Sequence, residues 1–259
     1  MAIGELTKVH LQNPYYGVTR FAQALHWSEH KARRIRNLAG IKAEVIRKKH
    51  RYKPSQAEIP APDNLVKTLA RFRRADKPQC GQDYTGMTRM DANIWVQDFT
   101  YVKTRIGMLF VAMVLRLATR EIVGWSVKTN HSAELTRDAL LDALSKHKTP
   151  NILHSDRGSE YMSYSLELVC QAAGIQMSAS SPHCPWQNGF CERIMSTFKN
   201  EGKSLYKVND IGEFMEAVAQ RIYYYNHQRI HTKLKMPPAT YAKIIGLSEV
   251  DKVSGKMGG

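Results

Sequence analysis

The stretch Ile94-Trp95-Val96-Gln97-Asp98-Phe99-Thr100-Tyr101-Val102 is rich in β-branched and aromatic residues, which predicts a β-strand with an acidic residue inside it. Two further strand-like runs follow, a nearly continuous apolar one over 108–115 and another over 121–127. The short gaps between the three runs are typical of antiparallel hairpins. Because 108–115 shows no polar alternation, we expect that strand to be buried on both faces of a covered sheet.

Helices and short strands alternate after these three strands. Ser132 and Ser163 are good N-caps for two helices, and Gly174 ends the second one. Short strand-like runs at 151–154 and 175–178 lie on either side of this second helix. The order β-β-β-α-β-α-β-α is that of an RNase H-like fold, so we expect an α/β core with a mixed five-stranded sheet.

The last third of the chain is predicted to be helical. One helix runs from Gly189 to about Glu201, and another begins at Asp210 with Glu213 as a partner in a capping-box-like arrangement. The apolar stripe of this second helix is predicted from helical spacing to be Ile211, Phe214, Met215, Val218, Ile222 and Tyr225. We expect the core to span residues 93–245, with a tail at 246–259.

The first 41 residues predict a small all-α domain. A helix that starts near Val18 is followed by a break at His26-Trp27 and by a second helix that Ser28 caps. The inner stripe of the second helix is expected to be Ala32, Ile35, Leu38 and Ala39, and its outer side is basic, with Lys31, Arg33, Arg34 and Arg36. Two short helices of this kind fit a helix-turn-helix whose recognition helix faces outward, although a solvated basic face is the alternative.

Charge is concentrated at the front of the chain. Residues 1–90 hold 18 Lys and Arg against 7 Asp and Glu, whereas the whole chain of 259 residues has a formal net charge of +15. Residues 42–92 are expected to be a basic linker with one short helix near 64–74, and Lys48, Lys49 and Arg51 are its candidate phosphate contacts. We therefore expect a polyanionic partner, and nucleic acid before a membrane surface.

Three carboxylates lie on elements that an α/β core brings together. Asp98 is inside its strand, Asp156 follows the short strand that ends at His154, and Glu192 lies on the helix 189–201. Ligands of open α/β sheets bind at such strand ends, and carboxylate oxygens hold the divalent ions that drive phosphodiester chemistry. Each of the three acids has a rival nearby: Asp91, Glu160 and Glu201, respectively, which the position along each element disfavours but does not exclude.

The helix that carries Glu192 adds two more candidates. Its apolar stripe Cys191, Ile194, Met195 and Phe198 is expected to dock on the sheet and to leave Glu192 at the margin. Lys199 lies seven residues after Glu192, on about the same face, where it is a candidate DNA contact. Asn188, one turn before Glu192, is a candidate either for DNA contact or for orienting the loop.

Taken together, the ordered motifs resemble the transposases of the IS3 family of bacterial insertion sequences. The matching segments are 95–101, 120–125, 154–161, 192–201 and 225–231, together with Pro237-Pro238 and a helix-turn-helix-like segment over 16–41. The resemblance implies a core shared with retroviral integrases and a triad of Asp98, Asp156 and, after 35 intervening residues, Glu192, with Lys199 as the basic partner. It also implies Mg²⁺ or Mn²⁺ as a two-ion cofactor.

The expected function is metal-dependent DNA strand cleavage and strand transfer by a 3′-hydroxyl, which is a polynucleotidyl transferase activity. The expected partners are double-stranded DNA, both terminal repeats and target, further copies of the chain on that DNA, and a product of an upstream reading frame. A non-catalytic regulator that binds the DNA ends and a stand-alone RNase H-like nuclease remain as alternatives. No run approaches the ~18 apolar residues of a membrane span, and a bacterial, cytoplasmic, nucleoid-associated protein is the default expectation.

Overall fold

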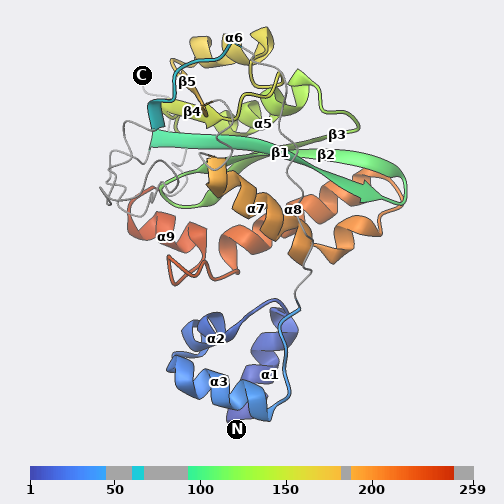
Figure 1. Ribbon diagram of the computed structural model, residues 1–259, viewed down its shortest axis with the longest axis vertical. Coiled ribbons are helices and arrows are strands. Elements are labelled where there is room, and N and C mark those ends of the chain that lie inside the picture. Colours follow the sequence, from blue (N-terminus) through green and yellow to red (C-terminus); the bar gives the residue numbers. More distant parts are fainter. Residues whose placement is uncertain (45–59, 67–92, 182–187, 248–259) are drawn as a thin grey trace, which may run out of the picture.

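The computed structural model describes residues 1–44, 60–66, 93–181 and 188–247. It has two parts in Figure 1, a layered α/β core and a unit of three helices below it. Of the predicted linker 42–92, the structure describes residues 42–44 and 60–66, and of the predicted tail 246–259 it describes 246–247. Leu65 and Val66 are the described helical residues of the segment 64–74. Within the described ranges, no helix combines the length and the apolar character needed to cross a bilayer.

The core is built on a mixed sheet of five strands, as the sequence predicts. The strands are β1 (Ile94–Thr104), β2 (Gly107–Arg116), β3 (Glu121–Lys128), β4 (Ile152–Ser155) and β5 (Gln176–Ala179), in the spatial order β3-β2-β1-β4-β5. The first three strands pair antiparallel as hairpins, and β4 and β5 add parallel to the β1 side. From Val111 to Leu115 β2 is buried on both faces, which confirms the expectation for that part of the apolar run, whereas Met108 near the start of the strand is exposed.

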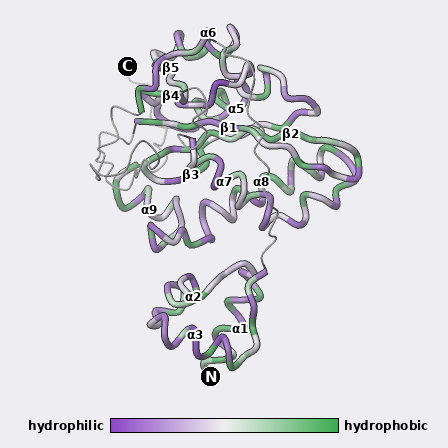
Figure 2. The backbone as a smooth tube through the Cα atoms, viewed as in Figure 1, coloured by the Kyte–Doolittle hydropathy of each residue, from purple (hydrophilic) through white to green (hydrophobic). Residues whose placement is uncertain are grey.

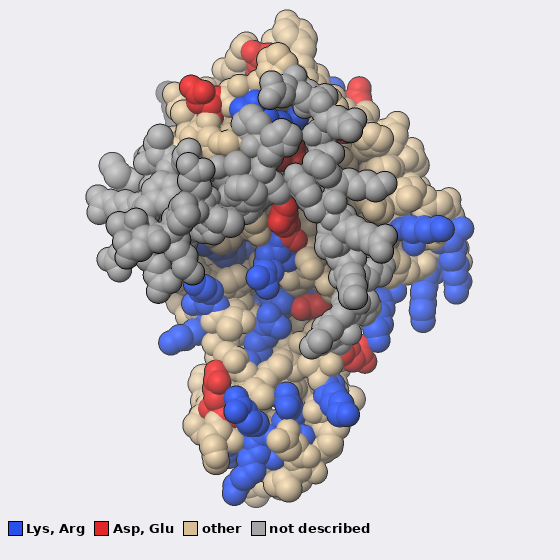
Figure 3. All heavy atoms as spheres, viewed as in Figure 1, with Lys and Arg blue, Asp and Glu red and all other residues tan. Residues whose placement is uncertain are grey.

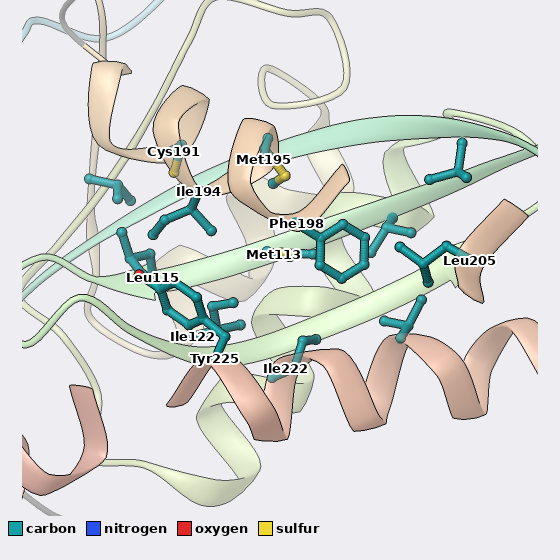
Figure 4. Packing of buried hydrophobic residues seen from close by; sticks show 14 of the residues in the cluster. Met113, Leu115, Ile122, Cys191, Ile194, Met195, Phe198, Leu205, Ile222 and Tyr225 are labelled. Carbon is teal, nitrogen blue, oxygen red and sulfur yellow. The ribbon is translucent and has the colours of Figure 1, made fainter. Parts of the chain in front are cut away.

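Helices cover both faces of the sheet (Figure 1). On one side lie α5 (Ala133–Lys146) and α6 (Tyr164–Ala172), which pack against Trp95, Val114 and Leu153. On the other side lie α7 (Gly189–Glu201), the short 3₁₀ helix η4 (Lys203–Tyr206) and α8 (Ile211–His227), and α9 (Pro238–Ile244) follows. Figure 4 shows Cys191, Ile194, Met195 and Phe198 of α7 pointing into the apolar cluster that contains Met113 and Leu115 of β2 and Ile222 of α8.

The unit below the core consists of α1 (Ala2–Gln12), α2 (Val18–Leu25) and α3 (Glu29–Leu38) around a small apolar cluster with Leu6, Phe21 and Ile35. Ser28 caps α3 as predicted, because its hydroxyl accepts a hydrogen bond from the backbone N–H of Lys31. The left-handed backbone of His26 makes the turn between α2 and α3. In Figure 2 α3 is largely purple, which reflects its polar outer side.

Three residues that helical spacing assigned to inner stripes are exposed. Leu38 is the last residue of α3, and Ile211 and Met215 lie on the first two turns of α8. Phe214, Val218, Ile222 and Tyr225 are buried as predicted. The buried stripe of α8 is therefore narrower than the predicted one.

A glycine sets how closely α5 approaches the sheet. A Cβ atom at Gly124 of β3 would lie 2.5 Å from the carbonyl oxygen of Ala139 and 2.6 Å from the backbone nitrogen of Ala143. Gly124→Ala is therefore expected to push α5 off the sheet and to lower the free energy of unfolding by about 1–3 kcal/mol, measured as a lower Tm. Gly4→Ala on α1 is the matched control, because its Cβ would meet no atom within 4 Å. Equal Tm values for Gly124→Ala and the unmodified chain would contradict the close packing.

Candidate active site

The two candidate aspartates lie at the same level, Asp98 on β1 and Asp156 just past the end of the neighbouring strand β4. In the parallel pair of β1 and β4, Val96 is opposite His154. Asp98 is two residues beyond Val96, and Asp156 is two residues beyond His154, just past the end of β4. Since β4 ends at Ser155, β1 continues beyond its partner, and the two acids lie where this pairing stops.

Both aspartates accept their hydrogen bonds from neighbouring groups on one oxygen. Asp98 Oδ1 accepts from the backbone N–H of Phe99 at 2.8 Å and from the hydroxyl of Tyr161 at 3.4 Å. Asp156 Oδ1 accepts from the backbone N–H of Gly158 at 3.0 Å. No hydrogen bond from the described residues reaches Oδ2 of either aspartate, so these oxygens remain for another ligand.

Burial and like charge make the ionised form of this pair unfavourable. Burial raises the pKa of Asp98 to about 8, and the carboxylates of Asp156 and Glu192 add to the rise against the hydrogen bond from Phe99. Burial also raises the pKa of Asp156, with a contribution from Glu160. A cation between the carboxylates would remove both penalties, which is the electrostatic condition of a metal site.

The third candidate acid, Glu192, comes from helix α7 and not from the sheet. It lies in the first turn of α7, which packs on β1, and its side chain is exposed while Cys191 and Ile194 beside it are buried. Among the described residues no three His, Cys, Asp or Glu side chains are already clustered closely enough to hold a metal ion. Like-charged carboxylates repel without a cation, and a rotation about the side-chain bonds of Glu192 moves its carboxylate by several ångströms. The two aspartates are thus a preformed pair, and Glu192 borders it.

An exposed aromatic ring of β1 lies beside Lys199 of α7. The Lys199 ammonium lies 5.2 Å from the centroid of the Tyr101 ring, three residues along the strand from Asp98. Tyr101 and Tyr161 both occur in the sequence motifs that contain the aspartates, but sequence reasoning assigned no role to either. Their presence in those motifs was the one indication in the sequence that the two tyrosines are near the site. The groups that they contact are seen only in the folded chain.

The alternative acids occupy different environments. Glu160 lies close to Asp156, since both carboxylates border Gly158. A Cβ added at Gly158 would lie 2.7 Å from Glu160 Oε2 and 3.2 Å from Asp156 Oδ1. Glu201 is engaged instead by Arg221 and Arg229, at 2.6 and 2.7 Å, so its carboxylate is already neutralised. Asp91 lies outside the described residues.

Asn188 is buried, and its Nδ2 donates to the carbonyl oxygen of Gln97 at 3.2 Å. This bond joins the start of α7 to β1 next to Asp98. A buried side chain cannot contact DNA in this arrangement, so the structure favours the second of the two expectations for Asn188, that it orients the segment.

The candidate DNA contacts of the first domain lie on the surface of α3. Lys31, Arg33 and Arg34 are exposed and Arg36 is partly exposed. Figure 3 shows Lys and Arg side chains over both the three-helix unit and the lower part of the core. Lys48, Lys49 and Arg51 lie outside the described residues.

The layered sheet, with its strand order and aspartate pair, defines the class of protein as an RNase H-like integrase core. Two family models, both described as an integrase core domain, match residues 89–185 and 173–238. One chain of the cryo-electron-microscopy structure of the simian T-cell lymphotropic virus intasome in complex with PP2A regulatory subunit B56 gamma has the same fold, with a TM-score of 0.50 at 15% identity over 90% of this chain and 72% of that chain.

Similarity to curated proteins narrows the class. The chain is 28% identical over 233 residues to the transposase of insertion sequence IS904 of Lactococcus lactis, covering 85% of this chain and 83% of the relative. It is 35% identical over 152 residues to the IS600 31 kDa protein of Shigella sonnei (57% and 56%), and 34% identical over 109 residues to transposase InsF of IS3A in Escherichia coli (41% and 38%). The match thus spans about half the length of the IS600 protein. These matches support an insertion-sequence transposase that carries an integrase core domain and is similar to the transposases of IS3-family elements.

Proposed function

We propose that the chain is a DNA transposase that cuts DNA at insertion-sequence ends and joins the resulting 3′-hydroxyl to target DNA. The observation that carries this proposal is the pair Asp98 and Asp156 at one level of neighbouring parallel strands, with Glu192 and Lys199 on the helix that packs beside them. The similarity to insertion-sequence transposases and the basic surface of α3 support DNA as the substrate.

The donor set suits a hard divalent cation such as Mg²⁺ or Mn²⁺. Asp98 and Asp156 would hold it through Oδ2, the oxygens that the neighbouring hydrogen bonds leave, and Glu192 would complete the set. Carboxylate oxygens without His or Cys ligands favour these ions over zinc. When bound, a pair of such ions supplies activation of the attacking oxygen and charge stabilisation of the leaving oxygen.

The remaining residues of the site act on position and charge. The hydrogen bonds from Phe99 and Tyr161 fix the Asp98 carboxylate, and the N–H of Gly158 fixes that of Asp156. Lys199 would bind a phosphate of the strand under attack, with Tyr101 beside its ammonium. Lys31, Arg33, Arg34 and Arg36 would bind the DNA end through α3, with Lys48, Lys49 and Arg51 on the phosphate backbone nearby.

Oligomerisation on DNA is also part of the proposal, because joining two ends of one element to a target requires two sites. One solved structure with the same fold is named as an intasome. A product of an upstream reading frame is a further proposed partner.

The proposed function is tested with the full chain, linear DNA that ends in the inverted repeats flanking the gene, a supercoiled target plasmid and Mg²⁺. We expect nicking at the 3′ ends and joining to the plasmid, with no products when the repeats are scrambled or the metal is chelated. End binding without cleavage in Mg²⁺ or Mn²⁺ would establish the binding regulator instead. Cleavage of the RNA strand of RNA–DNA hybrids without end specificity would establish the nuclease.

A further inference from the structure

Polar contacts hold α7 at both of its ends, beyond what its apolar stripe supplies. The N-terminal contact is the bond from Asn188 to the Gln97 carbonyl. The C-terminal contact is Glu201, nine residues and about 13 Å along the helix axis from Glu192. Because Glu192 and Lys199 lie between these anchors, the anchors set where both side chains can reach.

The contact at Glu201 is a buried, branched ion pair. Arg229 donates from Nε to Oε2 at 2.8 Å and from Nη2 to Oε1 at 2.7 Å, and Arg221 donates from Nη2 to Oε2 at 2.6 Å. All three side chains are at most 10% exposed. A bidentate guanidinium–carboxylate pair fixes both distance and orientation, so Arg229 restricts the end of α7 relative to the segment just after α8 more than a single bond would.

Burying these three charged side chains carries a desolvation penalty, so stability alone does not explain the cluster. Burial by itself would raise the pKa of Glu201, yet the bonds and charges of Arg229 and Arg221 hold that pKa below its ordinary value. An apolar cluster of similar volume often stabilises a fold as well as a buried ion pair or better, whereas a fixed geometry requires the directional bonds. The arrangement therefore points to positioning.

The three-helix unit contacts the core at the end of α8 and the residues just after it, next to Arg229. The backbone N–H of Ile230, the residue after Arg229, donates to the hydroxyl of Tyr16 at 2.8 Å. The hydroxyl of Tyr224 donates to Asn13 Oδ1 at 2.6 Å. Tyr16 is 2% exposed, so this hydroxyl contact lies inside the docking surface between the N-terminal helices and the end of α8.

We propose that Glu201 is a positioning residue, which holds α7 through Arg229 so that Glu192 and Lys199 are placed only when the three-helix unit is docked through Tyr16. Docking orders Ile230 and hence Arg229, and Arg229 orders Glu201 at the end of α7. The inference rests on the proposed function for its role in catalysis, but its structural content is independent of activity. Through this connection, DNA binding by the three-helix unit and the position of α7, which carries Glu192, depend on each other.

Hydrogen–deuterium exchange on the full chain, without metal or DNA, tests the connection. Glu201→Gln is expected to raise amide exchange in the last turn of α7 by roughly tenfold or more, and Arg229→Lys by less, because lysine keeps the charge but not the paired bonds. Tyr16→Phe is expected to raise exchange in α7 as well, although it lies in the other unit.

Tyr164→Phe on α6 and Glu167→Gln are the matched controls, since both side chains are exposed. The proposal is overturned if Tyr16→Phe changes exchange only in the three-helix unit and at 224–232, or if Arg229→Lys leaves α7 unchanged. Should Glu201→Gln fail to fold, these two variants still decide.

The metal requirement of strand transfer is a second readout. Tyr16→Phe and Arg229→Lys are each expected to raise the Mg²⁺ concentration for half-maximal transfer by about tenfold while end-DNA affinity changes by less than about twofold, and their effects should be non-additive. A merely structural role would lower the amount of folded protein and leave the Mg²⁺ dependence unchanged, which would contradict positioning. If the unmodified chain showed no strand transfer, the proposed function would be refuted. The exchange measurement would still test the connection from Tyr16 through Arg229 to Glu201.

Discussion

Glu192→Gln is expected to reduce strand transfer at least about 1,000-fold, because loss of a metal-bound carboxylate removes several kcal/mol of charge stabilisation and each 1.36 kcal/mol is a factor of ten in rate. The substitution preserves the shape of a side chain that is exposed on the first turn of α7, so the fold should not change. The loss is measured as joined product per unit time with saturating end DNA and Mg²⁺. End-DNA affinity should stay within about twofold, because DNA binding is dominated by phosphate contacts from basic residues.

Glu216→Gln on the exposed side of α8 is the matched control for this change. It removes an equal charge away from the aspartate pair and should transfer strands at the rate of the unmodified chain. Full activity of Glu192→Gln together with inactivity of Glu160→Gln would move the third ligand to Glu160, which borders Asp156 across Gly158.

Asp98→Asn is expected to have opposite effects on activity and stability. Strand transfer should fall at least about 1,000-fold for the same reason as above. The stability effect follows from the Asp98 pKa of about 8 in the folded chain, against about 3.9 for an unfolded aspartate. Between these pH values the folded state holds a proton that the unfolded state has lost, so the free energy of unfolding of the unmodified chain falls as pH rises, until the folded pKa is passed.

Asparagine removes this contribution and keeps the acceptor oxygen for Phe99 and Tyr161. In chelator, the Tm of Asp98→Asn minus that of the unmodified chain should therefore increase from pH 5 to about pH 8. Added Mg²⁺ should raise the Tm of the unmodified chain and not that of the variant. A difference in Tm that is independent of pH would show that Asp98 is ionised in the folded protein without metal.

The order of core elements could be predicted from sequence because each one shows its own periodicity. The runs 94–102, 108–115 and 121–127 became β1 to β3 with ends shifted by two residues or fewer, and 189–201 became α7. Whether neighbouring elements bury the side chains at the helix ends could not be predicted. Spacing places Ile211 and Met215 beside the buried stripe of α8, but only the neighbouring elements decide whether they are covered.

The candidate site was predictable as a set of residues but not as an arrangement. The sequence places Asp98 on one strand and Asp156 just past the end of another, whereas their common level depends on the register of Val96 with His154, which no local pattern specifies. The pairing of Glu201 with Arg221 and Arg229, and of Tyr16 with Ile230, joins positions far apart in the chain. These contacts arise from tertiary packing, so sequence reasoning kept Glu201 as a rival ligand instead.

The most direct test of the central claim, that these carboxylates bind a catalytic divalent metal, is strand transfer by Asp156→Cys compared in Mg²⁺ and Mn²⁺. A thiolate is a poor ligand for Mg²⁺ and a better one for the softer Mn²⁺, so activity should be lost in Mg²⁺ and recover at least about tenfold in Mn²⁺. Asp156→Ser, which offers no thiolate, should be inactive in both metals. Equal activity of Asp156→Cys and the unmodified chain in Mg²⁺, or equal activity of the Cys and Ser variants in Mn²⁺, would contradict the claim that Asp156 is a metal ligand.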